Sequence, residues 1–309
     1  MYTRVFPTGT VRYEPDKCWN GLTIIPNLYT SGKSTGAILY DMNGNVINHW
    51  PELHGGFDNK MLPGGQIFGV RKFTGGYWLD GQDLTQMDWN GKVLWSFNRG
   101  EEIMDLETGQ KVWSARLHHD FQREGCPTGY YCPGQPPRES GKTLINSGKT
   151  RKIPELSREH DVCDTNIIEV DEAGKILWSW SLYDHWDELG LEPTAKDVIC
   201  MRSRPFGNSG QVKDIYCNCV AYLGPNKWHT GGDTRFHPDN IITDIRALNV
   251  CFIIDRQSGR VVWRLGPDFL YSKELQDIGQ IVGQHQFHMI PQGLPGEGNV
   301  LLFDNGGQA

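Results

Sequence analysis

One sequence motif is repeated four times along the chain, and it constrains the fold more than any other feature of the sequence. Each copy has an apolar run, an aspartate, a turn that contains glycine, a second apolar run and a tryptophan. The copies are AILYDMNGNVINHW (37–50), LTQMDWNGKVLWSF (84–97), IIEVDEAGKILWSW (167–180) and CFIIDRQSGRVVWRL (251–265). Apolar residues that alternate on both sides of a glycine-containing turn are typical of a tight β-hairpin.

A second strand-like segment lies between these hairpins, each time beside a turn rich in glycine or proline. The examples are KMLPGGQIFGV (60–70), ESGKTLINSG (139–148), AYLGPNKW (221–228) and HMIPQGLPGEGNVLLF (288–303). Two hairpins per unit make a four-stranded sheet, and repeats of such sheets are typical of a β-propeller. We therefore predict an all-β fold, a single propeller domain over residues 1–309. The tryptophans, which stand at a constant place, are expected to pack between blades.

Four hairpin units and the start of a fifth are visible in the sequence. Because a propeller must close into a ring, and rings commonly have six or more blades, we expect the closing blade at the carboxyl end to be incomplete. The stretch DHWDELGLEPTAKDVI (184–199) predicts a short helix in an insertion between strands. Loops and insertions on one face of a propeller are where function usually lies.

The net charge of −7 opposes attraction to nucleic acid or to an anionic membrane surface. No apolar run approaches the roughly 20 residues that a membrane helix needs, so neither partner is expected. The first residues, MYTRVFPTGTVRYEPDKCWNG, lack the basic and apolar regions of a secretory signal. A cytoplasmic and a periplasmic location both stay open, and the oligomeric state is not indicated.

None of the eight cysteines belongs to a CxxC pair, which argues against a zinc ribbon. Cys126 and Cys132 bracket the segment CPTGYYC. They either close a small disulfide loop in an oxidising compartment or remain free thiols.

Histidines stand in comparable places between the hairpins. The segments are RLHHDFQREG (116–125), GGDTRFHPDN (231–240) and GQHQFHMIP (283–291). Equivalent positions of successive blades face the centre of a propeller, so we expect His118 or His119, His237 and His285 to converge on one pocket. His285 and His288 are three residues apart, and side chains alternate along a strand. We therefore expect only His285 to face the centre.

Two chemistries fit such a cluster. Neutral imidazoles could bind a transition metal, as in metal-dependent hydrolases and lyases. Alternatively, one imidazole is a nucleophile, and the others stabilise an anionic transferred group together with an arginine. Arg246, in the segment IITDIRALNVCFIID, directly follows the HPDN loop and is expected to point toward the same centre. A cation there suits an oxyanion and repels a metal.

Several segments closely resemble the bacterial arylsulfotransferase family, the PAPS-independent aryl-sulfate sulfotransferases. They are HHDFQREG, GPNKWHTGGDTRFHPDNII, IIDRQSGRVVWRLGPDF and GQHQFHMIPQGLPGEGNVLLFDNGG. The resemblance implies a six-bladed propeller that moves a sulfuryl group from an aryl sulfate to a phenol. It further implies a ping-pong route through a sulfated histidine, without a cofactor. Members are typically longer at the carboxyl end, in agreement with the missing closure.

The resemblance also implies roles for individual residues. The first histidine of GQHxxH, His285, matches the nucleophile, and Arg246 matches the family's arginine. His118 or His119 matches the histidine of the HHD segment.

A further family histidine lies in a segment of the form His-x-Asn-Ser, where this chain has Tyr216 followed by Asn218. Tyrosine, with a reference pKa of about 10, can donate a hydrogen bond to an oxyanion but cannot be a second imidazolium at neutral pH. Asn218, His237 and His288 are expected to contact the substrate.

The tyrosine leaves three interpretations open. The first is aryl sulfotransfer as in the family, with small-molecule aryl sulfates and phenols as partners. The second is a lyase or hydrolase that holds a divalent metal on the same histidines. The third is a non-catalytic propeller that binds a ligand, since a fold does not determine a function.

Overall fold

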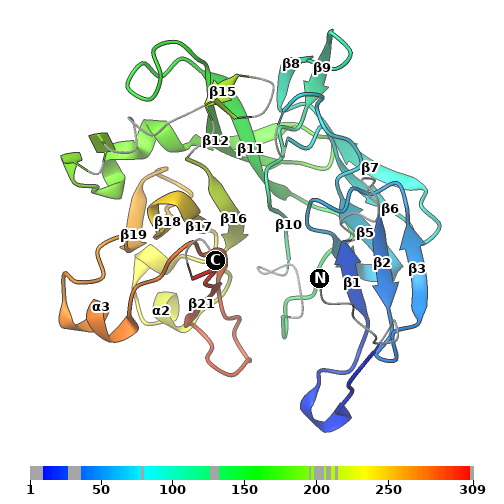
Figure 1. Cartoon of the computed structure of the whole chain (residues 1–309). Helices are drawn as coiled ribbons and strands as arrows, with labels where there is room; N and C mark the ends of the chain where they lie inside the picture. The colour runs from blue at the N-terminus through cyan, green and yellow to red at the C-terminus, as the bar shows by residue number, and fades with distance from the viewer. Residues whose placement is uncertain are drawn as a thin grey trace, which may run out of the picture.

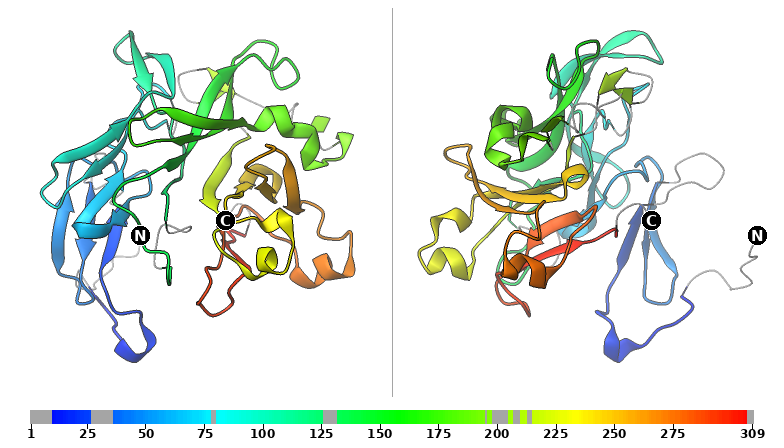
Figure 2. Two further views of the ribbon diagram at one scale, coloured as in Figure 1. Left: turned by 180° about the vertical axis from the view of Figure 1, so that it is seen from behind. Right: turned by 60° about the vertical axis from the view of Figure 1, so that its left-hand side comes forward.

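The computed structural model describes residues 10–26, 36–77, 80–125, 132–194, 196–197, 205–206, 210–212 and 215–306. Its strands form sheets that follow one another around a common centre, from blue through green to red in Figure 1 and in the views of Figure 2. All strand pairs in the described residues are antiparallel except β12 (Val162–Val170) with the short insertion strand β15 (Gln211–Val212). In the described part of the chain, three sheets have the full set of four blade strands. The prediction of an all-β propeller with four-stranded blades is confirmed.

The blades are numbered in chain order. The first has three strands, β1 (Thr23–Pro26), β2 (Ala37–Tyr40) and β3 (Val46–Trp50). The second contains β4 (Lys60–Leu62), β5 (Gln66–Gly69), β6 (Leu84–Met87) and β7 (Val93–Phe97). The third contains β10 (Phe121–Arg123), β11 (Thr143–Arg151), β12 (Val162–Val170) and β13 (Ile176–Ser181). The fourth contains β16 (Cys217–Tyr222), β17 (Ile241–Ile245), β18 (Val250–Ile254) and β19 (Val261–Leu265). A last pair, β20 (His285–Met289) and β21 (Val300–Phe303), follows.

The four predicted hairpins are β2–β3, β6–β7, β12–β13 and β18–β19, and the aspartate of each has a local role. Asp41 accepts the backbone N–H groups of Asn43 and Asn45, at 2.9 and 2.8 Å. Asp88 accepts the equivalent groups of Asn90 and Lys92, both at 2.9 Å. Because the side chain replaces backbone partners inside the turn, the repeated aspartate fixes the hairpin.

Tryptophans tie each blade to the next one. The Nε1–H of Trp50 on β3 donates to the carbonyl of Asp88 at 3.0 Å. Trp95 on β7 donates to the carbonyl of Glu172 at 2.8 Å, and Trp180 on β13 donates to that of Gly259 at 2.8 Å. Each acceptor lies in the outer hairpin turn of the following blade, which confirms the expected packing between blades.

Several helices and short strands are inserted between the strands of the blades. The predicted helix 184–199 corresponds in part to the 3-10 helix η3 (Leu182–Leu189). The hairpin β8 (Glu101–Asp105) to β9 (Gln110–Ser114) and the short strands β14 (Pro205–Phe206) and β15 (Gln211–Val212) were not predicted. Beyond β16 lie the helices α2 (Lys227–Thr230), η4 (Thr234–Phe236), η5 (Arg246–Leu248) and α3 (Lys273–Ile278). Within the described residues, no helix has the length and apolarity to cross a membrane.

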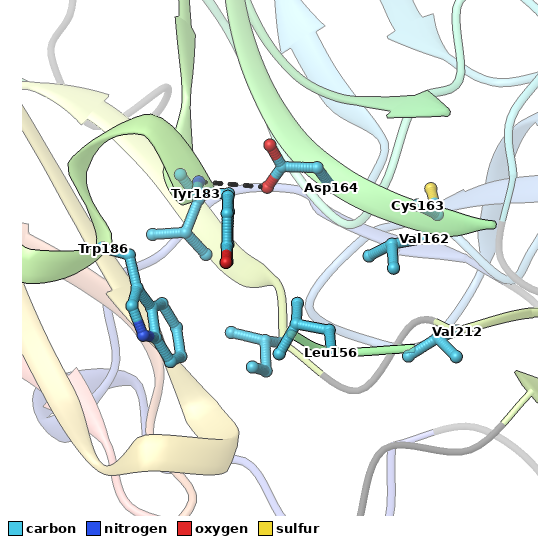
Figure 3. Close-up of a pocket in the computed structure, with 9 residues that line it drawn as sticks. Leu156, Val162, Cys163, Asp164, Tyr183, Trp186 and Val212 are labelled. Carbon is cyan, nitrogen blue, oxygen red and sulfur yellow. Dashed lines mark hydrogen bonds between the residues drawn. The ribbon is translucent and has the colours of Figure 1, made fainter. Parts of the chain in front are cut away.

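Figure 3 shows how η3 packs on the third blade. A cavity of about 10 Å³, room for about one water molecule, is lined mainly by apolar side chains such as Leu156 and Trp186. Asp164 of β12 points toward it and accepts the backbone N–H of Tyr183 at 3.3 Å. Burial raises the pKa of Asp164 to about 6, although Arg151, at 3.0 Å, opposes the rise.

Candidate active site

Four aromatic side chains meet where three inner strands begin. His118 and His119 precede β10, Tyr216 precedes β16, and His285 opens β20. The ring centroid of His118 lies 4.1 Å from that of His119 and 4.4 Å from that of Tyr216. His119 lies 5.5 Å from Tyr216, nearly parallel to it, and 6.1 Å from His285. The structure therefore brings these four predicted site residues together.

The two adjacent histidines are hydrogen-bonded to each other. The Nδ1 atoms of His118 and His119 lie 2.6 Å apart, so one ring donates and the other accepts. His119 has a left-handed backbone (φ 63°), which turns its side chain away from the ordinary strand direction. His118 is buried, with 3% of its surface exposed, and His119 is half-buried.

His285 is oriented by a backbone carbonyl. Its Nδ1 lies 3.1 Å from the carbonyl oxygen of Gly283, and the side-chain amide of Asn305 lies 3.2 Å from the same nitrogen. A carbonyl oxygen can only accept, so the tautomer that bonds to Gly283 carries its proton on Nδ1 and its lone pair on Nε2. The amide NH2 of Asn305 can only donate, so it makes no hydrogen bond to Nδ1 in this tautomer. Burial lowers the pKa of His285, and the nearby Arg246 lowers it further. The ring is therefore neutral at neutral pH.

Arg246 supplies a positive charge beside this histidine. It opens η5 directly after β17 and is half-buried. Among the described residues, no carboxylate lies within ion-pair distance of its guanidinium. An arginine without an internal anion can bind an anionic group of a ligand.

A β-bulge places His288 on the same face as His285, so the prediction of opposite faces is wrong. His285 pairs with Phe303 and His288 with Leu301, with a register shift between the two pairs. The partners are two residues apart on β21 and thus share a face. Gln286, with φ 52°, is the extra residue of the bulge.

A network of charged side chains, Lys60 and Asp120, lies near His288. Lys60 at the start of β4 donates to Asp120 at 2.6 Å and to the carbonyl of Phe121 at 2.5 Å. The other carboxylate oxygen of Asp120 accepts the backbone N–H of Val220 at 2.9 Å. Asp120 therefore joins the second, third and fourth blades at the centre of the ring.

Sequence reasoning missed this network. Asp120 directly follows the histidine pair, and Lys60 opens an inner strand, so both occupied positions comparable to the predicted site residues. Asp58, two residues before Lys60, accepts the side-chain N–H of Gln286 at 3.0 Å and so joins the last strand pair to the second blade.

Asn218 lies two residues after Tyr216 and is buried, with 2% of its surface exposed. Neither polar atom of its side-chain amide has a hydrogen-bond partner among the described residues. Its backbone N–H bonds to Asp244, a carboxyl group at the fourth blade's core. The amide is thus available to a ligand that reaches this depth.

His237 does not join the cluster, so the prediction of its convergence is wrong. Its ring packs against His229, at 4.8 Å between centroids, and its charge acts on Asp255 in the turn that follows β18. It precedes β17, whereas Arg246 follows that strand. Five strand residues separate the two by roughly 16 Å.

In the described part of the chain, no group of three or more histidine, cysteine or carboxylate side chains could hold a metal ion. Cys126 lies outside the described residues, so its predicted pairing with Cys132 has no structural description here. Cys132 itself is buried.

Comparison with known proteins identifies the family of the chain. The search of curated proteins gives no match. Among solved structures, a protein of unknown function from Bacteroides caccae has 12% identity, with 87% of this chain and 78% of that chain covered and a TM-score of 0.32. The Dos1 propeller has 12% identity, with 76% and 53% covered and a TM-score of 0.30. The family model of arylsulfotransferase (ASST) matches residues 9–309.

Proposed function

The chain belongs to the arylsulfotransferase family and is an enzyme of that type, and we propose that it transfers a sulfuryl group from an aryl sulfate to a phenol through a sulfated His285. The observation that carries the proposal is the state of His285. Its Nδ1–H is directed at the Gly283 carbonyl, so the neutral ring offers the Nε2 lone pair. A neutral imidazole with a fixed tautomer is a competent nucleophile.

In the first half of the reaction, Nε2 of His285 attacks the sulfur atom. The bond from sulfur to the aryl oxygen breaks, and its electron pair leaves with that oxygen. Arg246 neutralises charge on the sulfuryl oxygens, since no carboxylate of the described chain competes for its guanidinium. Preorganised donors of this kind typically contribute a factor of about 10²–10³ each.

Tyr216 and whichever ring of the His118–His119 pair accepts at Nδ1, and so carries its proton on Nε2, donate hydrogen bonds to the sulfuryl and leaving oxygens. Asn218 adds an amide whose donors and acceptor have no internal use among the described residues. In the second half, the oxygen of an acceptor phenol attacks the sulfur on His285 and regenerates the neutral ring. The proposed route uses no cofactor.

The decisive measurement is mass spectrometry after a short reaction of the protein with p-nitrophenyl sulfate. We expect a burst of p-nitrophenolate and a sulfuryl adduct that peptide mapping assigns to His285. The variant His285→Ala should lose both signals. His49→Ala is a matched control, because His49 is exposed on the outer strand β3. Absence of adduct and of phenol release in the unmodified protein would refute the proposal.

A further inference from the structure

The two histidines of β20 face charges of opposite sign. The charge near His285 is the cation of Arg246, which disfavours protonation of the ring. The charge near His288 is the anion of Asp120, which favours protonation, although burial keeps the pKa of His288 below its usual value. Pairs of titratable groups whose surroundings differ in this way divide nucleophilic and acid–base roles between them.

Lys60 and Asp58 complete the charged network around Asp120. Lys60 also acts on His288, but its ammonium is held by Asp120 at 2.6 Å. Asp58 lies near both of these groups, and burial followed by repulsion from Asp120 raises its pKa. Asp120 is therefore the group that partly offsets the cost of burial when a proton arrives at His288.

The tautomer of His288 also suits a base. Its Nδ1 lies 2.7 Å from the carbonyl oxygen of Gln286, which can only accept. In the neutral ring the proton is therefore on Nδ1 and the lone pair on Nε2. The bulge at Gln286 turns this ring to the face on which the nucleophile lies.

The spacing of the two rings matches a transfer between them. Their cross-strand partners are two residues apart, which corresponds to about 7 Å along the strand. An acceptor oxygen that attacks sulfur bound to His285 approaches it at about 3 Å, on the side away from the histidine nitrogen. His288, about 7 Å from His285 along the same face, can then reach that oxygen within about 3 Å.

We infer that His288 is the general base that deprotonates the acceptor phenol, an inference that rests on the proposed sulfotransfer. The phenolic oxygen forms its bond to sulfur while its proton moves to Nε2 of His288. The bond from sulfur to Nε2 of His285 breaks, and its electron pair returns to that nitrogen. The products are an aryl sulfate, neutral His285 and protonated His288, which then releases its proton to water.

The test uses His288→Asn, because the asparagine amide retains a donor for the Gln286 carbonyl and removes the base. Sulfo-His285 is first formed with p-nitrophenyl sulfate, whose leaving group departs without a proton. Its decay is then followed with two acceptors, one ionised and one neutral at the assay pH. We expect the neutral phenol to react about 10²–10⁴-fold more slowly than with the unmodified protein. The loss with the ionised phenolate should be at least tenfold smaller, and added imidazole should restore part of the rate.

Equal losses with both acceptors, or no loss with either, would overturn the role of His288. His49→Asn is the matched control and should behave as the unmodified protein with both acceptors. If His288→Asn does not fold, His288→Gln gives the same comparison of acceptors. Failure of the unmodified protein to form the adduct would refute the proposed function itself, and this inference with it.

Discussion

Replacement of Lys60 by methionine tests whether the central network holds the blades together. Lys60 and Asp120 are 16% and 5% exposed and bond at 2.6 Å, and the carbonyl of Phe121 accepts a second bond from the ammonium. Lys60→Met leaves the Asp120 carboxylate buried without its cation. Loss of one partner of a buried pair costs about 3–5 kcal/mol in the free energy of unfolding. In a chain of this size, that corresponds to a fall in Tm of roughly 5–15 °C.

The pH dependence gives an independent check on the cause. Burial and Asp120 raise the pKa of Asp58 in the folded state, and Lys60 opposes that rise. When a carboxyl group has a higher pKa in the folded than in the unfolded state, the free energy of unfolding falls as the pH rises above the unfolded-state pKa. Without Lys60 the pKa of Asp58 rises further, so Lys60→Met should be more destabilising at pH 8 than at pH 5.

Urea denaturation at both pH values measures these effects. Lys111→Met is the control, since Lys111 lies 3.8 Å from Glu102 in an exposed pair, which contributes at most about 1 kcal/mol. If Lys60→Met shifts the free energy of unfolding no more than Lys111→Met, or does so equally at both pH values, the network is not a determinant of stability.

Two further changes test the blade contacts and the buried acid of the fourth blade. Trp180→Phe should lower the free energy of unfolding by about 1–3 kcal/mol, because the Gly259 carbonyl loses its donor at 2.8 Å. Trp113→Phe is the control in the same urea titration and should change the free energy of unfolding little, because the Trp113 side chain is 48% exposed. Burial raises the pKa of Asp244 to about 7, so the unmodified protein should lose stability as the pH rises through that value, by up to about 1.4 kcal/mol per unit. Asp244→Asn, which can still accept the Cys219 N–H, should flatten this decline, and an unchanged slope between pH 5 and 8 would contradict the assignment.

The hairpins could be predicted because their determinants are local. Alternating apolar residues, a glycine in the turn and an aspartate that caps it lie within one short stretch. Equivalent positions then located His118, His119 and His285, and the resemblance to the family located Tyr216. The β8–β9 hairpin carried a similar signal, since Asp105 accepts the N–H of Thr108 at 2.8 Å, but it lacked the repeated spacing.

The errors have physical reasons that the sequence does not display. His288 was assigned to the wrong face because Gln286 adopts a left-handed conformation that sequence rarely reveals for a residue other than glycine. His237 was placed in the cluster because its segment lies between hairpins like those of the other histidines. It precedes β17, however, at the end of the strand opposite Arg246. The contact of Lys60 with Asp120 joins residues 60 positions apart on different blades, so only the assembled ring defines it.

Tyr216 stands where the resemblance implies a histidine of the family, and its hydroxyl group can be tested separately from its ring. The ring packs at 4.4 Å from His118 and 5.5 Å from His119, and Tyr216→Phe retains these contacts. If the hydroxyl donates to the leaving oxygen, Tyr216→Phe should lower kcat/KM for phenyl sulfate by about 10²-fold.

The loss should be smaller for p-nitrophenyl sulfate, whose leaving oxygen carries less charge. Tyr216→His, which restores the family's residue, should recover the rate with phenyl sulfate, because an imidazole can donate to the same oxygen. Equal activity of the unmodified protein and Tyr216→Phe with both donors would mean that the tyrosine only packs against the histidines. Stabilisation of the leaving oxygen would then have to come from His118 or His119, whose rings pack against Tyr216.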